Sequence, residues 1–151
     1  MCCSFQSLLS NLFCILLPSM KTIAFSAALT EDVSLNPNDK VIYNKIFTNY
    51  GNTYDGSTGE FKAPVDGIYG IYMYLLTQTG QEGWLELIHN QDYVVSVYAK
   101  QDGAYDAAGN SVMLRLKEGD ILFVRARRLS KLYGRSDQAY SSWNIHLISA
   151  L

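Results

Sequence analysis

Short apolar runs separated by turn residues dominate the chain from Lys21 onward, and this pattern limits the possible folds more than any other feature. Within Thr22–Leu29, the side chains of Ile23, Phe25 and Ala27 share one face, as in a strand with one buried side. The runs recur at intervals of roughly 8–12 residues without a convincing helical period, which is typical of an all-β protein. We therefore predict an all-β protein, a two-sheet antiparallel sandwich or jelly roll, without long helices. The predicted strands are Thr22–Leu29, Val41–Phe47, Gly67–Thr77, Trp84–His89, Tyr93–Lys100, Ser111–Leu116, Ile121–Leu129 and Trp143–Ser149.

The composition indicates one well-packed domain. The chain has 151 residues, of which 17% are charged and 13% aromatic, so it can bury a core and is too apolar for intrinsic disorder. Its eleven tyrosines suggest a surface that contacts a partner, because tyrosine combines an apolar ring with a polar tip. A net charge of −2 gives no reason to expect a nucleic-acid partner. One basic cluster lies on an alternating run, and we expect an outward strand face there rather than a phosphate site. This cluster comprises Arg125, Arg127, Arg128 and Lys131.

Residues 1–20 differ from the rest of the chain. The apolar run Leu8–Leu17 has about the length of a signal-peptide core and is well short of the roughly 20 residues that span a bilayer. We therefore interpret 1–20 as a signal peptide or disordered extension and 21–151 as the domain, and we expect a secreted, extracellular protein without stable membrane insertion. A mis-assigned start before Met20 and a short buried extension are the alternatives, since no Lys or Arg precedes the run. Because Cys2, Cys3 and Cys14 all lie in this segment, the domain itself has no cysteine for a disulfide or zinc site.

An ordered series of aromatic residues, glycines and one asparagine surrounds the stretch TNYGNTYDGSTGEF, residues 48–61. Its spacing is Tyr43-x5-Asn49-x4-Tyr54-x6-Phe61-x5-Gly67-x-Tyr69. This series resembles the signature of the globular-head domain of the complement C1q family, which shares the tumour-necrosis-factor jelly roll. The resemblance extends over about residues 22–148. It also rests on AFSA at 24–27, GEFKAPVDGIY at 59–69, NSVMLRL at 110–116, Gly119-Asp120 and YSSW at 140–143.

We expect the stretch 48–61 to form a corner between strands. Glycines turn the backbone, Asn49 bonds to the backbone of the turn, and Tyr54 and Phe61 anchor the corner in the core. Ile145 stands where the family typically has glycine, and we expect its bulk to disturb close packing near the last strand.

The resemblance implies a homotrimer in which three jelly rolls pack around an axis through an apolar sheet face. We expect a cluster such as Tyr69, Tyr98, Phe123 and Trp143 to supply this face, because large apolar patches rarely stay exposed. Alternation along one strand places either Ile71 and Met73 or Tyr72 and Tyr74 toward the core. The full set predicted for the core and the interface is Phe25, Tyr43, Asn49, Tyr54, Phe61, Gly67, Tyr69, Tyr98, Phe123 and Trp143.

No combination of residues predicts catalysis. The two histidines, His89 and His146, lie in predicted strands without H-x-x-x-H spacing or a cysteine partner, and we expect structural roles for both. No G-x-S-x-G nucleophile elbow occurs. We therefore predict that the protein is not an enzyme.

A calcium site is predicted at Asp102 and Asp106, two carboxylates in one loop between strands. The resemblance implies such a site, because some family members bind calcium near the trimer apex through carboxylates of this loop. Asp106 lies six residues before Val112 and matches one position, whereas Asp102 matches the other only if the loop is shortened. The alternative is an Asp-Gly turn with a solvated carboxylate.

The resemblance to short, head-only members implies a secreted, lectin-like pattern-recognition protein of innate immunity. Loops on a rigid scaffold would bind repetitive carbohydrate or protein ligands, and three copies would add avidity. We expect the ligand contacts in the loops around Gly80, Asp102 and Tyr133. A cytokine-like or synaptic-organiser-like ligand for a cell-surface receptor is the alternative, and an intracellular or structural oligomer is a third interpretation if 1–20 is not a signal.

Overall fold

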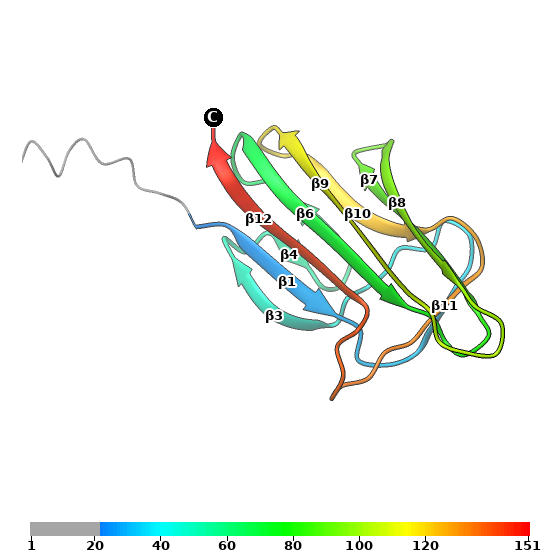
Figure 1. Ribbon diagram of the computed structural model, residues 1–151. Helices are drawn as coiled ribbons and strands as arrows, with labels where there is room; N and C mark the ends of the chain where they lie inside the picture. The colour runs from blue at the N-terminus through cyan, green and yellow to red at the C-terminus, as the bar shows by residue number, and fades with distance from the viewer. Residues whose placement is uncertain (1–21) are drawn as a thin grey trace, which may run out of the picture.

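Residues 22–151, the part of the chain that the computed structural model describes, form two five-stranded sheets packed face to face and a small two-stranded sheet (Figure 1). All pairings are antiparallel, which confirms the predicted sandwich. The first sheet has the order β3 (Lys45–Tyr50), β1 (Ala24–Ala28), β12 (Ser142–Ala150), β6 (Gly67–Leu76), β9 (Ala107–Leu116). The second has the order β4 (Tyr54–Asp55), β5 (Glu60–Lys62), β10 (Ile121–Ala126), β7 (Glu82–His89), β8 (Asp92–Lys100). The small sheet pairs β11 (Ser130–Leu132) with β2 (Val33–Leu35).

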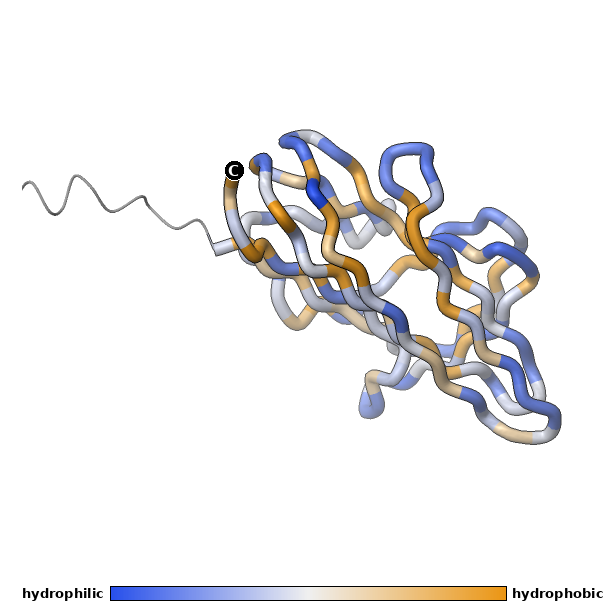
Figure 2. The backbone as a smooth tube through the Cα atoms, turned by 45° about the horizontal axis from the view of Figure 1, so that its top comes forward, coloured by the Kyte–Doolittle hydropathy of each residue, from blue (hydrophilic) through white to orange (hydrophobic). Residues whose placement is uncertain are grey.

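The core lies between the two large sheets and follows the alternation of the strands. Ile23, Phe25 and Ala27 are buried together, as predicted from their spacing. Along β6, Ile71 and Met73 are buried in the core. Figure 2 shows that the turns at the ends of the sheets are largely hydrophilic, whereas hydrophobic segments lie along the strands.

Aromatic side chains fill one end of this core. The ring of Phe25 stacks on Tyr54 with a centroid distance of 4.2 Å and meets the edge of Trp143 at 5.2 Å. Phe61 and Tyr69 lie next to each other with ring centroids 6.0 Å apart. These contacts join residues from β1, β4, β5, β6 and β12, so the cluster ties both sheets together.

The stretch 48–61 forms the predicted corner. The Asn49 carbonyl oxygen Oδ1 accepts hydrogen bonds from the backbone N–H groups of Thr53 (2.9 Å) and Tyr54 (3.1 Å), and Asn49 Nδ2 donates to the Tyr54 carbonyl (3.0 Å). Gly51 has a φ of 90°, as a tight turn requires. The Tyr54 hydroxyl donates to the backbone carbonyl of Tyr43 (3.1 Å). Burial raises the pKa of Tyr54 to about 12, so this hydroxyl stays protonated and remains a donor.

Several details differ from the sequence-based expectation. β9 begins at Ala107 rather than at the predicted Ser111, and β10 ends at Ala126 rather than at the predicted Leu129. The predicted strand Val41–Phe47 begins only at Lys45, because Val41 N bonds to Val124 O and Tyr43 N bonds to the Tyr54 hydroxyl instead of joining a neighbouring strand in a ladder. The expected disturbance at Ile145 is absent: its side chain is buried and keeps register with the two strands beside β12.

In the described part of the chain, no helix has the length and apolar character that crossing a membrane requires. The predicted signal segment, 1–20, lies outside the described residues.

Candidate functional site

The three loops predicted to carry ligand contacts meet at one end of the sandwich, where β6 ends close to β11 (Figure 1). Gly80 N donates to Ala104 O (2.8 Å), which joins the β6–β7 loop to the loop around Asp102. Tyr133 N donates to Leu76 O (2.8 Å), which fixes the third loop against the end of β6. Segments far apart in the sequence therefore form one surface, which we call the loop end.

Three tyrosines gather at the loop end. The ring centroids of Tyr105 and Tyr133 are 5.2 Å apart at an interplanar angle of 78°, and those of Tyr133 and Tyr140 are 6.0 Å apart. Tyr105 and Tyr140 are 51% and 52% exposed, and the Tyr133 hydroxyl donates to Gln138 Oε1 (3.3 Å). Such rings can pack against the apolar face of a sugar or peptide while their hydroxyls form hydrogen bonds. We call Tyr105, Tyr133 and Tyr140 the loop-end tyrosine cluster.

Tyr140 also borders a shallow depression of about 500 Å³. Tyr74 forms part of its lining, together with the small residues Ala107, Ala108 and Gly109 of β9. This depression therefore lies where the loop end meets the outward face of the first sheet.

The predicted calcium residues lie at the loop end, but both carboxylate oxygens of Asp106 already accept hydrogen bonds from backbone N–H groups. Its Oδ2 accepts a hydrogen bond from Lys100 N (2.8 Å), and its Oδ1 accepts one from Ala107 N (3.0 Å). Within residues 22–151, no three His, Cys, Asp or Glu side chains gather as a metal-binding group. Since calcium takes six to eight oxygen ligands, Asp102 and Asp106 would need further oxygens from the backbone, water or neighbouring protomers. Calcium binding therefore stays a prediction.

On the face of the first sheet that points away from the core, aromatic rings lie close to the strands. Tyr74 lies over Gly109, where an added Cβ would come within 2.6 Å of Tyr74 Cδ1. Tyr72 stacks on His146 with a centroid distance of 5.8 Å and an interplanar angle of 6°. An added Cβ at Gly70 would come within 2.8 Å of His146 Cε1, so Gly70 and Gly109 both allow rings to approach the backbone. Met113 on the neighbouring strand β9 is 74% exposed. We call this surface, defined by Tyr72, Tyr74, Gly109, Met113 and His146, the first-sheet outer face.

The predicted interface cluster is wrong in part. Tyr69 and Trp143 are fully buried within the protomer, because alternation along β6 and β12 points them toward the second sheet. Tyr98 and Phe123 belong to β8 and β10 of the second sheet and do not share a surface with the first-sheet outer face. A subunit contact through Tyr98 and Phe123 stays a prediction.

The remaining predicted residues serve the core and the corner. Phe25, Tyr43, Tyr54 and Phe61 are buried aromatic residues of the core. Gly67 starts β6 where an added Cβ would come within 2.6 Å of Leu147 Cδ1 and within 2.7 Å of the Ser149 carbonyl oxygen, so a larger residue would push β12 away. These residues therefore support the scaffold rather than a ligand site.

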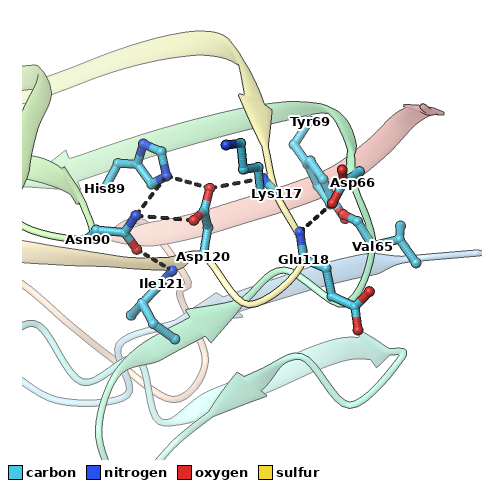
Figure 3. Close-up of polar contacts among 9 residues, drawn as sticks. All are labelled: Val65, Asp66, Tyr69, His89, Asn90, Lys117, Glu118, Asp120 and Ile121. Atoms are coloured by element: carbon cyan, nitrogen blue, oxygen red, sulfur yellow. Dashed lines mark hydrogen bonds and ion pairs between the residues drawn. The ribbon is translucent and has the colours of Figure 1, made fainter.

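His89 has the structural environment that was expected for it (Figure 3). Its Nε2 lies 2.8 Å from Asp120 Oδ2, and this carboxylate also accepts hydrogen bonds from Asn90 Nδ2 (3.1 Å) and Lys117 N (2.9 Å). Partial burial alone would raise the pKa of Asp120, but these hydrogen bonds outweigh it and hold the pKa below its ordinary value. The cluster ties the β7–β8 turn to the β9–β10 turn, at the Gly-Asp pair noted in the sequence.

Sequence reasoning missed Tyr105 and Tyr140 as site residues. The signal that could have found them is the high tyrosine content combined with their position in loops rich in Gly, Ser and Asp. Large aromatic residues in such loops cannot all reach the core, so some remain available to a partner.

The comparisons with solved structures agree with the fold. The globular domain of the zebrafish complement 1qA protein superimposes with a TM-score of 0.71 at 17% identity, covering 86% of this chain and 99% of that one. Eiger TNF from S. frugiperda gives a TM-score of 0.67 at 16% identity, covering 87% and 95%. Murine APRIL at pH 5.0 gives 0.67 at 15% identity, covering 85% and 100%. These likenesses establish a shared architecture.

Sequence comparisons identify the family. Complement C1q tumor necrosis factor-related protein 3 of Homo sapiens is 34% identical over 111 residues, which cover 72% of this chain and 45% of that protein. Complement C1q tumor necrosis factor-related protein 6 of Rattus norvegicus is 29% identical over 113 residues, covering 73% and 43%. The chain thus spans less than half the length of these curated relatives. The family model of the C1q domain matches residues 24–148, and the chain therefore belongs to the C1q domain family.

Proposed function

We propose that this protein is a secreted homotrimer that binds repetitive surface ligands, carbohydrates in particular, as a lectin-like pattern-recognition module of innate immunity. The observation that carries the proposal is the first-sheet outer face. It combines an exposed methionine with aromatic rings that lie over glycines, and such an apolar surface favours burial against copies of itself. Around a threefold axis, each copy would bury one side of this face against its neighbour.

The loop-end tyrosine cluster is the surface proposed for ligand binding. Tyr105 and Tyr140 are half exposed and reach into solvent from loops on a rigid β scaffold. A trimer would present three such clusters at once, so weak contacts with single sugars would add up on a repetitive surface.

The trimer is tested by the mass of the secreted full-length protein in solution, measured by light scattering and sedimentation. Met113→Asp places a charge in the proposed interface and should yield monomers, because a buried unpaired carboxylate is costly. Leu129→Asp is the matched control, since Leu129 is an exposed apolar residue outside the first-sheet outer face and its variant should remain a trimer. A monomeric unmodified protein would contradict the proposal.

Ligand binding is tested with a glycan array, in the presence of calcium and in the presence of a chelator. Tyr105→Ala and Tyr140→Ala should lose most of the array signal. Tyr50→Ala, which removes a tyrosine at least as accessible as these two from the edge strand β3, should keep the array signal. Loss of the array signal on chelation would support the calcium site if Asp102→Asn and Asp106→Asn also lose the signal in the presence of calcium. An empty array together with saturable binding to one cell-surface receptor would favour the cytokine-like alternative, which the names of the curated relatives bring forward.

A further inference from the structure

A surface with an unusual charge distribution lies on the outward face of the second sheet, on the side of the sandwich opposite the first-sheet outer face. Glu86 on β7 is only 5% exposed and holds two arginines. Arg125 Nη2 lies 3.1 Å from Glu86 Oε2, and Arg127 Nη1 lies 3.3 Å from Glu86 Oε1. The carboxylate is thus covered by the guanidinium groups that it holds, and the outermost layer of this surface is cationic.

Aromatic rings extend this cationic layer sideways. The guanidinium carbon of Arg128 lies 5.1 Å from the centroid of the Trp84 ring, a cation–π arrangement. Trp84 in turn meets the edge of Tyr98 on β8, with ring centroids 5.3 Å apart. We call this surface, formed by Trp84, Glu86, Tyr98, Arg125, Arg127 and Arg128, the arginine face.

The arginine face carries excess positive charge although the whole chain has a net charge of −2. Two guanidinium groups, those of Arg125 and Arg127, share the single carboxylate of Glu86, and Arg128 adds a third positive charge beside them, which leaves a local excess of two (three minus one). Among the described residues, Arg128 forms no ion pair. Glu82 and Lys100, which oppose each other on β7 and β8, add one charge of each sign and leave the excess unchanged.

We propose that the arginine face binds an acidic polysaccharide, a chain of sugar rings that carries sulfate or carboxylate groups. Arg125 at the end of β10 and Arg127 just beyond it meet over Glu86, whereas Arg128 lies over Trp84. The positive charges are thus spread along this surface, which suits a row of negative charges better than a single small anion. Guanidinium groups bind sulfate and carboxylate through paired N–H donors, and the neighbouring rings of Trp84 and Tyr98 can pack against sugar rings.

This inference goes beyond the proposed function and does not use the loop-end tyrosine cluster. The arginine face belongs to the second sheet, whereas the proposed trimer contact belongs to the first, so the arginine face stays accessible in a trimer. Three copies would then engage one long polymer at several points, which raises the overall affinity.

The experiment measures binding of the full-length protein to four immobilised polymers at increasing salt: a sulfated polysaccharide (heparin), a carboxylated one (hyaluronan), neutral dextran and single-stranded DNA. Binding to heparin or hyaluronan but not to dextran is expected, and the two acidic arms show which charged group is preferred. The double variant Arg127→Gln/Arg128→Gln should bind at least about tenfold more weakly. Its slope of log affinity against log salt should fall by about one for each arginine that contacts the polymer.

The matched control is Lys62→Gln/Lys117→Gln, which removes two positive charges at exposed positions outside the arginine face and the loop end. Among the described residues neither lysine forms an ion pair, so the control separates the effect of position from that of charge. Arg128→Gln alone is the second variant, because it breaks no ion pair and keeps the test valid if the double variant folds poorly. It should lower the affinity several-fold.

Three outcomes would overturn the inference. One is the absence of binding to both acidic polysaccharides. Another is an equal loss in the control variant, which would indicate a general charge effect. The third is DNA binding as tight as polysaccharide binding and equally sensitive to the variants, since charge alone would then explain the result. The glycan array of the loop end provides the separate readout: Arg127→Gln/Arg128→Gln should leave that signal unchanged, so either proposal can fail without the other.

Discussion

Replacing Asn49 by alanine should destabilise the protein more than any other single exposed or half-buried polar substitution near the corner. The side chain forms three hydrogen bonds with backbone groups of the turn, two as acceptor from Thr53 N and Tyr54 N and one as donor to Tyr54 O. A typical hydrogen bond contributes about 0.5–1.5 kcal/mol net. Three such bonds give an expected loss of about 1.5–4.5 kcal/mol, and access of water to the half-buried groups places the value toward the lower end of this range.

The assay is urea unfolding followed by tryptophan fluorescence at one fixed protomer concentration, because oligomer stability depends on concentration. Asn49→Asp keeps both acceptor contacts and loses the donor, so it should fall between the unmodified protein and Asn49→Ala. Asn44→Ala is the control: Asn44 forms two exposed hydrogen bonds with Thr30 and should cost less than about 1 kcal/mol. A loss for Asn49→Ala no greater than that for Asn44→Ala would refute the idea that this side chain holds the corner.

Three further substitutions test other parts of the structure. Gly109→Val would push aside the Tyr74 ring and should weaken the trimer at least about tenfold in sedimentation experiments, whereas an unchanged dissociation constant would place the interface elsewhere. The folded protein lowers the pKa of Asp120 below its ordinary value of 3.8. The ionised carboxylate therefore stabilises the fold at pH values above 3.8, and this contribution is lost as the pH falls through the lower pKa of the folded state. Unfolding free energies of the unmodified protein and Asp120→Asn should therefore converge below about pH 4, and a constant difference down to acid pH would contradict the role of the His89 cluster. Glu86→Gln leaves two guanidinium groups without their carboxylate and should cost about 1–3 kcal/mol in thermal unfolding, and an unchanged stability would contradict a structural role for this buried carboxylate.

The strands and the corner could be predicted because their signals are local. Ile23, Phe25 and Ala27 alternate within one strand, and such alternation survives in any sandwich that buries one face. Asn49 and Tyr54 lie five residues apart, so turn chemistry alone brings them together. The strands β2, β4, β5 and β11 escaped prediction because they have only two or three residues, too few to show a period.

The assignment of residues to the core or to an interface could not be predicted in the same way. Tyr69 and Trp143 were expected in an interface cluster together with Tyr98 and Phe123. All four are aromatic residues on alternating strands, so their chemistry does not distinguish them. Tyr69 and Trp143 are buried because they face the second sheet, whereas Tyr98 and Phe123 are not, and these orientations depend on which sheets pack together.

Local patterns in the sequence are enough to predict the all-β architecture, the C1q-type corner and the inward side chains of the first strand, since alternation and turn geometry act over a few residues. Which surfaces exist depends on how the sheets pack. Only the tertiary structure brought Tyr105 and Tyr133 within 5.2 Å and placed Arg128 against Trp84. These contacts follow from strand order, and that order depends on pairings such as β1 with β12, which join the two ends of the domain. No local pattern encodes such pairings, because their free energy comes from the core that the whole chain buries together.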